Sequence, residues 1–150
     1  MNRDFSVGQA NELIKGEKIY DLHNCFDFSG LNIAPGLLGL SFRPNEIHGE
    51  GSSCILVFAE GVNRFAVSPD FGRSTVKHLE EIGYKSPGDE DDHWLLRQNQ
   101  AALSDDLFFR FNDGHYVRFH SERASLVEAF ITFDPGLNAP IALPRGWLGA

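Results

Sequence analysis

Cysteine is scarce in this chain of 150 residues, which contains only Cys25 and Cys54. Two cysteines cannot build a disulfide framework, although one bond between them stays possible. No apolar run approaches the roughly 20 residues that a membrane-spanning helix needs. The amino terminus also lacks the apolar stretch and the small-residue cleavage site of a signal peptide. We therefore expect a soluble cytoplasmic protein with reduced thiols.

Positive charge is sparse as well, because 13 Lys and Arg residues stand against 21 Asp and Glu residues, for a net charge of −8. Phosphate groups are bound mainly through Lys and Arg, so this deficit argues against a nucleic-acid partner and against an anionic membrane surface. Aromatic residues make up 12% of the chain, which is unlike a disordered protein. At this length we expect a single domain, residues 1–150, with a sizeable core.

Motifs for metals and phosphates are missing from the sequence: it contains no CxxC, HxxxH or HExxH pattern and no Gly-rich phosphate loop. We therefore predict no metal, no cofactor and no catalytic residue. One alternative hypothesis rests on His23 and Cys25, which would point to the same face of a strand. With Asp21 or Asp27 orienting the imidazole, they could form a nucleophilic pair in a small hydrolase, or mark a ligand-binding β-domain. An ordinary polar strand face explains the same residues.

Two segments have features typical of short helices. Residues 6–16 offer Ser6 and Gln9 as a capping box and Gly16 as a terminator. Residues 74–83 begin with a possible N-cap and place Val76, Leu79 and Ile82 at helical spacing. Residues 93–103 fit either a third helix or a loop.

Alternating or continuous apolar residues predict strands at residues 19–28, 38–42 and 54–67, with both faces of 54–58 covered. A hairpin over residues 107–119 with a three-residue loop would pair Phe109 with Val117 and Leu107 with Phe119, and would place Gly114 in the left-handed region. Residues 126–133 fit a last strand or a short helix. Residues 134–150 form a Pro- and Gly-rich tail, expected to be irregular and packed on the domain. The predicted fold class is α+β, mainly an antiparallel sheet, sandwich-like or half-barrel, with two or three short helices.

Acidic residues cluster between positions 80 and 106, a segment that contains eight Asp and Glu residues but only two basic residues, Lys85 and Arg97. Such a cluster can be a solvated loop that keeps the protein soluble. It can also be a negative patch that steers and docks a basic protein, with Trp94 as an anchor inside a charged rim or as an ordinary core residue. On the second interpretation, the predicted partner-binding residues are Asp89, Glu90, Asp91, Asp92, Trp94, Asp105 and Asp106.

Four segments together resemble the small acidic immunity proteins of bacteria, the antidotes of polymorphic-toxin and contact-dependent inhibition systems. They are residues 20–23 (Tyr-Asp-Leu-His), 38–42 (Leu-Gly-Leu-Ser-Phe), 55–62 (Ile-Leu-Val-Phe-Ala-Glu-Gly-Val) and 109–114 (Phe-Arg-Phe-Asn-Asp-Gly). The resemblance implies a non-enzymatic protein that covers a toxin, often a basic nuclease, by stoichiometric binding. We expect a monomer or a homodimer, and the apolar tail could dock on another copy.

Overall fold

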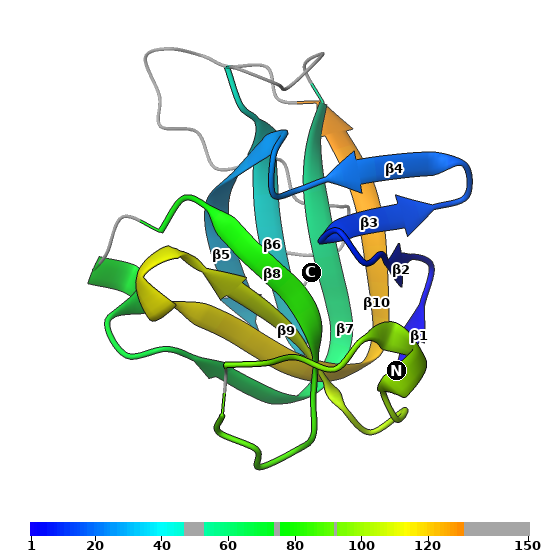
Figure 1. Ribbon diagram of the computed structural model, residues 1–150, viewed down its shortest axis with the longest axis vertical. Helices are drawn as coiled ribbons and strands as arrows, with labels where there is room; N and C mark the ends of the chain where they lie inside the picture. The colour runs from blue at the N-terminus through cyan, green and yellow to red at the C-terminus, as the bar shows by residue number, and fades with distance from the viewer. Residues whose placement is uncertain (47–52, 74–75, 92, 131–150) are drawn as a thin grey trace.

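One bent antiparallel sheet forms most of the computed structural model, which describes residues 1–46, 53–73, 76–91 and 93–130 (Figure 1). Neighbouring strands follow the order β5-β6-β7-β10-β9-β8. Their bounds in this order are Phe26–Ala34, Leu37–Pro44, Ser53–Val67, Tyr116–Phe130, Asp106–Phe111 and Leu79–Lys85. The short β1 (Asn2–Arg3) pairs in parallel with β10. A small second sheet contains β2 (Ser6–Val7), β3 (Glu12–Lys15) and β4 (Lys18–Asp21).

The sheet curls because its two longest strands, β7 and β10, change register together. Their pairing shifts between His120 and Ser121, and Gly61 lies on β7 at the same level with a φ of 65°. A Cβ at Gly61 would lie 2.8 Å from side-chain carbons of Glu122, so both the conformation and the space favour glycine. Before the shift β10 pairs with β9, and after it β10 pairs with β1. The result is a curled half-barrel.

The core fills the concave side of this half-barrel and is closed by the small sheet. Leu107, Phe109 and Phe111 of β9 lie on one face of the strand and are fully buried. Leu13 of β3 and Leu22, which follows β4, cover them from the other side and are also fully buried. Each such side chain contributes roughly 1.5–3 kcal/mol by leaving water. The other core residues are Phe5, Leu38, Leu40, Phe42, Ile55, Val57, Ala59, Leu79, Ile82, Tyr84, Val117, Phe119, Ala124 and Leu126.

Polar contacts fasten the small sheet to the end of β10. The Tyr20 hydroxyl donates to Glu128 Oε1 at 2.6 Å, and Lys18 Nζ lies 3.2 Å from the same oxygen. Burial, together with the hydrogen bond to the carboxylate, raises the pKa of Tyr20 to about 12. The same hydrogen bond, reinforced by Lys18, lowers the pKa of Glu128. Lys15 Nζ donates to the Leu126 carbonyl at 2.7 Å, so the hairpin is fixed at two points.

The predicted α+β class is wrong, because the only helices in the described residues are three 3₁₀ turns of three residues each. The expected helix over residues 6–16 is instead β2, a turn and β3, and Asn11 takes a left-handed φ of 61° between them. Within the expected helix over residues 74–83, residues 79–83 belong to β8. Its pairing with β9 shifts between Leu79 and Glu81, so a bulge places Leu79 and Ile82 on one face, three residues apart. That spacing imitates a helical period.

Other sequence-based expectations are confirmed. In the β9–β10 hairpin Val117 pairs with Phe109 and Phe119 with Leu107, and Gly114 has a φ of 74°. The apolar segment that begins β7 is covered on both faces, since Cys54, Ile55, Leu56 and Val57 are each at most 4% exposed. Residues 126–130 of the expected last element are the end of the longer strand β10, while its residues 131–133 and the predicted tail over residues 134–150 lie outside the described residues. None of the described helices is long and apolar enough to cross a bilayer.

Candidate protein-binding site

The His23 and Cys25 pair lies on a turn between two strands. β4 ends at Asp21 and β5 begins at Phe26, and the Cys25 N–H donates to the Asp21 carbonyl at 2.9 Å. The continuous strand predicted over residues 19–28 is therefore broken, and with it the reason to place both side chains on one face. His23 Nδ1 instead lies 2.7 Å from the Leu79 carbonyl oxygen. Neither cysteine forms a disulfide bond.

The structure divides the predicted acidic cluster into paired and unpaired carboxylates. Arg110 contacts both Glu80 and Glu81 on the outer side of the sheet. Lys85 Nζ lies 3.4 Å from Asp89. Two further acids, Asp105 and Asp106, are buried with 6% and 5% of their surface exposed. Much of the formal negative charge of this region is thus compensated within the protein.

Asp106 is the centre of a buried ion network. Its Oδ2 accepts from Arg118 Nε at 2.9 Å, and its Oδ1 accepts from Arg64 Nε at 3.0 Å. Asp105 accepts a hydrogen bond from the Ala102 N–H at 2.7 Å. Both carboxylates are occupied inside the protein, so we leave Asp105 and Asp106 out of the candidate contact surface. Asp92 lies outside the described residues.

Arg118 connects this network to the segment after β8, the 86–96 loop. Its guanidinium donates to the carbonyls of Ser86, at 3.0 Å, and of Asp89. Within the loop, Asp89 accepts from the Asp91 N–H at 3.0 Å, and Asp91 accepts from the His93 N–H at 2.9 Å. The backbone hydrogen bond from Asp91, with help from Lys85, lowers the pKa of Asp89. The first half of the loop is therefore held by a buried cation and by its own side chains.

The second half of the 86–96 loop is held against the free edge of β8. Tyr84 and Leu96 exchange two backbone hydrogen bonds of 3.0 and 2.8 Å, like a short added strand. Leu95 is buried where it crosses Gly83. A Cβ at Gly83 would lie 2.5 Å from Leu95 Cβ and 2.9 Å from the Leu96 carbonyl oxygen. Glycine at this position is what lets the loop approach so closely.

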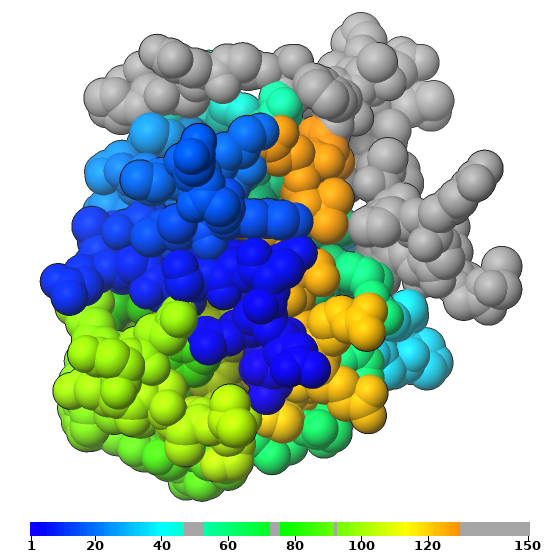
Figure 2. Space-filling view, turned by 90° about the vertical axis from the view of Figure 1, so that its right-hand side faces the viewer, coloured from blue at the N-terminus to red at the C-terminus, as the bar shows by residue number. Residues whose placement is uncertain are grey.

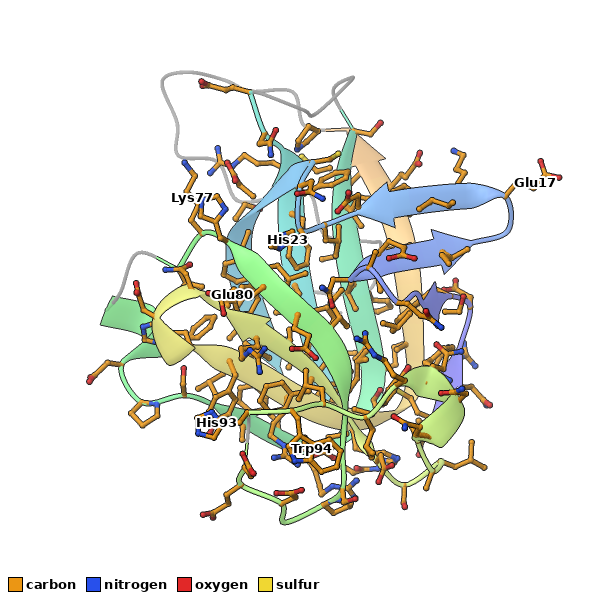
Figure 3. All side chains as sticks on the ribbon, in the orientation of Figure 1. Glu17, His23, Lys77, Glu80, His93 and Trp94 are labelled. Carbon is orange, nitrogen blue, oxygen red and sulfur yellow. The ribbon has the colours of Figure 1, made fainter. Side chains whose placement is uncertain are left out.

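Trp94 lies on this loop, in the same lower part of the molecule as His93 (Figure 3). Its side chain is 57% exposed, so the alternative that Trp94 belongs to the core is wrong. Lys85 Nζ lies 4.5 Å from the centre of the ring and is itself 1% exposed, which holds the indole by a cation–π contact. Glu90 and Asp91 are exposed on the same loop. An indole and two carboxylates are thus presented together on a fastened segment.

A hollow of about 780 Å³ lies beside the 86–96 loop on the outer side of the sheet. Its wall includes Phe108 and Tyr116, whose rings stack at 5.1 Å, together with Glu90 of the loop and Arg64. It offers space for a side chain of a bound partner. The role of Arg118 was missed by sequence reasoning, although the predicted pairing of Phe109 with Val117 implies that the next residue, Arg118, lies opposite Phe108.

Among the described residues no group of three or more His, Cys, Asp or Glu side chains could hold a metal ion. The candidate site consists of the exposed Trp94 and the exposed carboxylates of Glu90 and Asp91. No protein-family model, no curated protein and no solved structure shows significant similarity to this chain.

Proposed function

We propose that the protein is a non-enzymatic binding module of the immunity type, which neutralises a basic protein partner through the exposed part of the 86–96 loop. The observation that carries this proposal is Trp94, more than half exposed on a loop that is fixed at both ends. Large exposed aromatic side chains are enriched among the residues that dominate binding energy in protein interfaces. Glu90 and Asp91 supply negative charge beside it.

Preorganisation of the loop supports this function. Association normally loses about 0.5–1.5 kcal/mol for each flexible side chain that becomes ordered. In this loop the contacts of Arg118, Lys85 and Leu96 already restrict the backbone and the indole before a partner arrives. The adjacent hollow lets one partner side chain enter beside Glu90. A basic partner fits best, because exposed carboxylates also accelerate its encounter with the loop.

The test starts with affinity capture from extracts of the native cell, followed by purification of the captured protein and titration calorimetry. We expect Trp94→Ala to weaken binding by at least about 2 kcal/mol, which is the size of an interface hot spot. We expect Glu90→Gln combined with Asp91→Asn to reduce the association rate and the dependence of affinity on salt. Asparagine at position 91 retains the acceptor for the His93 N–H.

Glu17 provides the matched control for charge, since it is exposed at the tip of the β3–β4 hairpin, far from Trp94 (Figure 3). Glu17→Gln should leave the affinity unchanged. If Trp94→Ala binds as tightly as the wild type, or if Glu17→Gln weakens binding as much as the loop variants do, the 86–96 loop is not the contact surface. For an immunity function, the purified partner must also lose its toxic activity on stoichiometric mixing.

A further inference from the structure

A second hollow, of about 510 Å³, lies between the amino-terminal segment, β8 and the residues that follow the 86–96 loop. Figure 2 shows this side of the molecule, where the blue amino-terminal segment lies against the yellow-green residues near position 100. None of the described residues that line the hollow is acidic. Two of them are arginines, and the polar ones are Arg3, Ser6, Gln9, Arg97, Gln98 and Asn99.

Arg3 is a partly buried cation without a counter-ion among the described residues. Its Nη1 atom is buried and has no hydrogen-bond partner there. The guanidinium lies 5.0 Å from the centre of the Tyr84 ring, which supplies only a cation–π contact. Burial lowers the pKa of Arg3. Guanidinium groups are hydrogen-bonded when buried, because an unsatisfied buried cation is unfavourable.

Arg97 lines the same hollow from the opposite segment. Its Nη1 donates to the Gln9 carbonyl at 3.2 Å, a contact that bridges the two walls without neutralising the charge. Gln98 Oε1 accepts from the Val7 N–H at 2.6 Å and ties the walls a second time. The hollow is therefore held in shape by contacts that pair neither guanidinium with a carboxylate within the described part of the chain. The carboxylate of Glu12 lies against Gly8, which lines the hollow, and forms no ion pair with either arginine.

Such arginines stand out in a protein with 21 acidic and 13 basic residues. On the outer side of the sheet Arg64, Arg110 and Arg118 each contact a carboxylate. Carboxylates are plentiful, yet the walls of this hollow contain none. Planar guanidinium groups bind carboxylate and phosphate oxygens in pairs. We propose that this hollow is a binding site for a small oxyanion, a carboxylate or a phosphate group, held between Arg3 and Arg97.

The hydroxyl of Ser6 and the side-chain amides of Gln98 and Asn99 add neutral hydrogen-bonding groups around the two charges. This site is independent of the proposed partner surface, which depends on Trp94, Glu90 and Asp91. A bound oxyanion would neutralise charge between two segments that are far apart in the sequence. Binding should therefore also stabilise the folded protein.

The experiment titrates the wild-type protein with inorganic phosphate and, separately, with succinate, while sodium chloride keeps the ionic strength constant. Calorimetry measures affinity, and the melting temperature gives an independent readout. We expect saturable binding of at least one anion with a dissociation constant of roughly 1 mM or below. Phosphate alone would assign the site to phosphate groups, and succinate alone would assign it to carboxylates. No saturable binding of either anion would overturn the proposal.

Charge-matched variants locate the site. Arg97→Gln should weaken binding about tenfold, the effect expected when one charge-assisted contact is lost. Arg3→Gln should weaken binding by the same factor. If Arg3→Gln fails to fold, Arg97→Gln still tests the site, because Arg97 is exposed. Arg123→Gln removes the same charge from an exposed position of β10 that does not line the hollow. Equal weakening by Arg123→Gln would show nonspecific screening and would contradict the assignment.

Discussion

Removing the charge of Asp106 should destabilise the protein far more than removing the charge of an exposed carboxylate such as Glu17. The substitution Asp106→Asn keeps the size of the side chain but leaves Arg118, whose side chain is 11% exposed, without a carboxylate. Breaking a buried pair in this way costs roughly 3–5 kcal/mol. The contact with Arg64 adds only about 0–1 kcal/mol, because that side chain is 40% exposed. We therefore expect a total loss of about 4 kcal/mol.

Urea denaturation followed by circular dichroism measures this loss directly, and the melting temperature should fall by about 10 °C for a chain of this size. A second readout is the fluorescence of Trp94 in a Trp147→Phe background, because Arg118 also fastens the 86–96 loop. The control Arg64→Gln should cost no more than about 1 kcal/mol. Combining Asp106→Asn with Arg118→Met should cost clearly less than the sum of the two single changes.

A loss below about 1 kcal/mol for Asp106→Asn would refute this reasoning. It would mean that the network contributes no net stability and that the loop is held by its contacts with β8 alone. Additive effects of Asp106→Asn and Arg118→Met would contradict the direct coupling on which the expected loss depends.

Three further changes test other parts of the fold. Tyr20→Phe should cost about 1–2 kcal/mol near neutral pH, by loss of a hydrogen bond to a carboxylate. In the wild type, the folding stability that follows from the lowered pKa of Glu128 is present above pH 4.5 and is lost on acidification. The folding stability that follows from the raised pKa of Tyr20 is present below pH 10 and is lost as the pH rises through about 12. Denaturant titrations across this range should show both losses, and their absence in the wild type would exclude the contact. Leu13→Ala should cost about 2–5 kcal/mol in the same assay, and a cost below about 1 kcal/mol would show that the small sheet does not close the core. Gly83→Ala should displace Leu95 and raise amide exchange in the 86–96 loop, and unchanged exchange would contradict the close approach.

The hairpin of β9 and β10 could be predicted because local signals agree there. The alternation of Leu107, Phe109 and Phe111 sets the buried face, and Gly114 adopts the positive φ that the turn requires. Both are properties of neighbouring residues. The confirmed pairs of Phe109 with Val117 and Leu107 with Phe119 follow from them.

The helix predicted over residues 74–83 failed for a reason that no local pattern reveals. A bulge at Glu80 changes the period of a strand for one step, and only the pairing with β9 shows it. The acidic cluster was misread in part for a related reason. Asp106 looks like a surface acid in sequence, but it is buried and paired with Arg118 and with Arg64, which is 42 residues away. Trp94 could not be assigned to surface or core, because its exposure depends on where Leu95 and Leu96 attach to β8.

The pairing of β1 with β10 also dictates when the molecule can be completed. Asn2 lies beside Arg123, and Asp4 accepts a hydrogen bond from the Leu126 N–H across 122 positions of the chain. During synthesis β1 can therefore pair only after β10 has been made. Architectures dominated by such distant pairings fold slowly, over roughly milliseconds to seconds. Until β10 has been made, β7 lacks one of its two neighbouring strands, so the core residues of β6 and β7 cannot be fully covered.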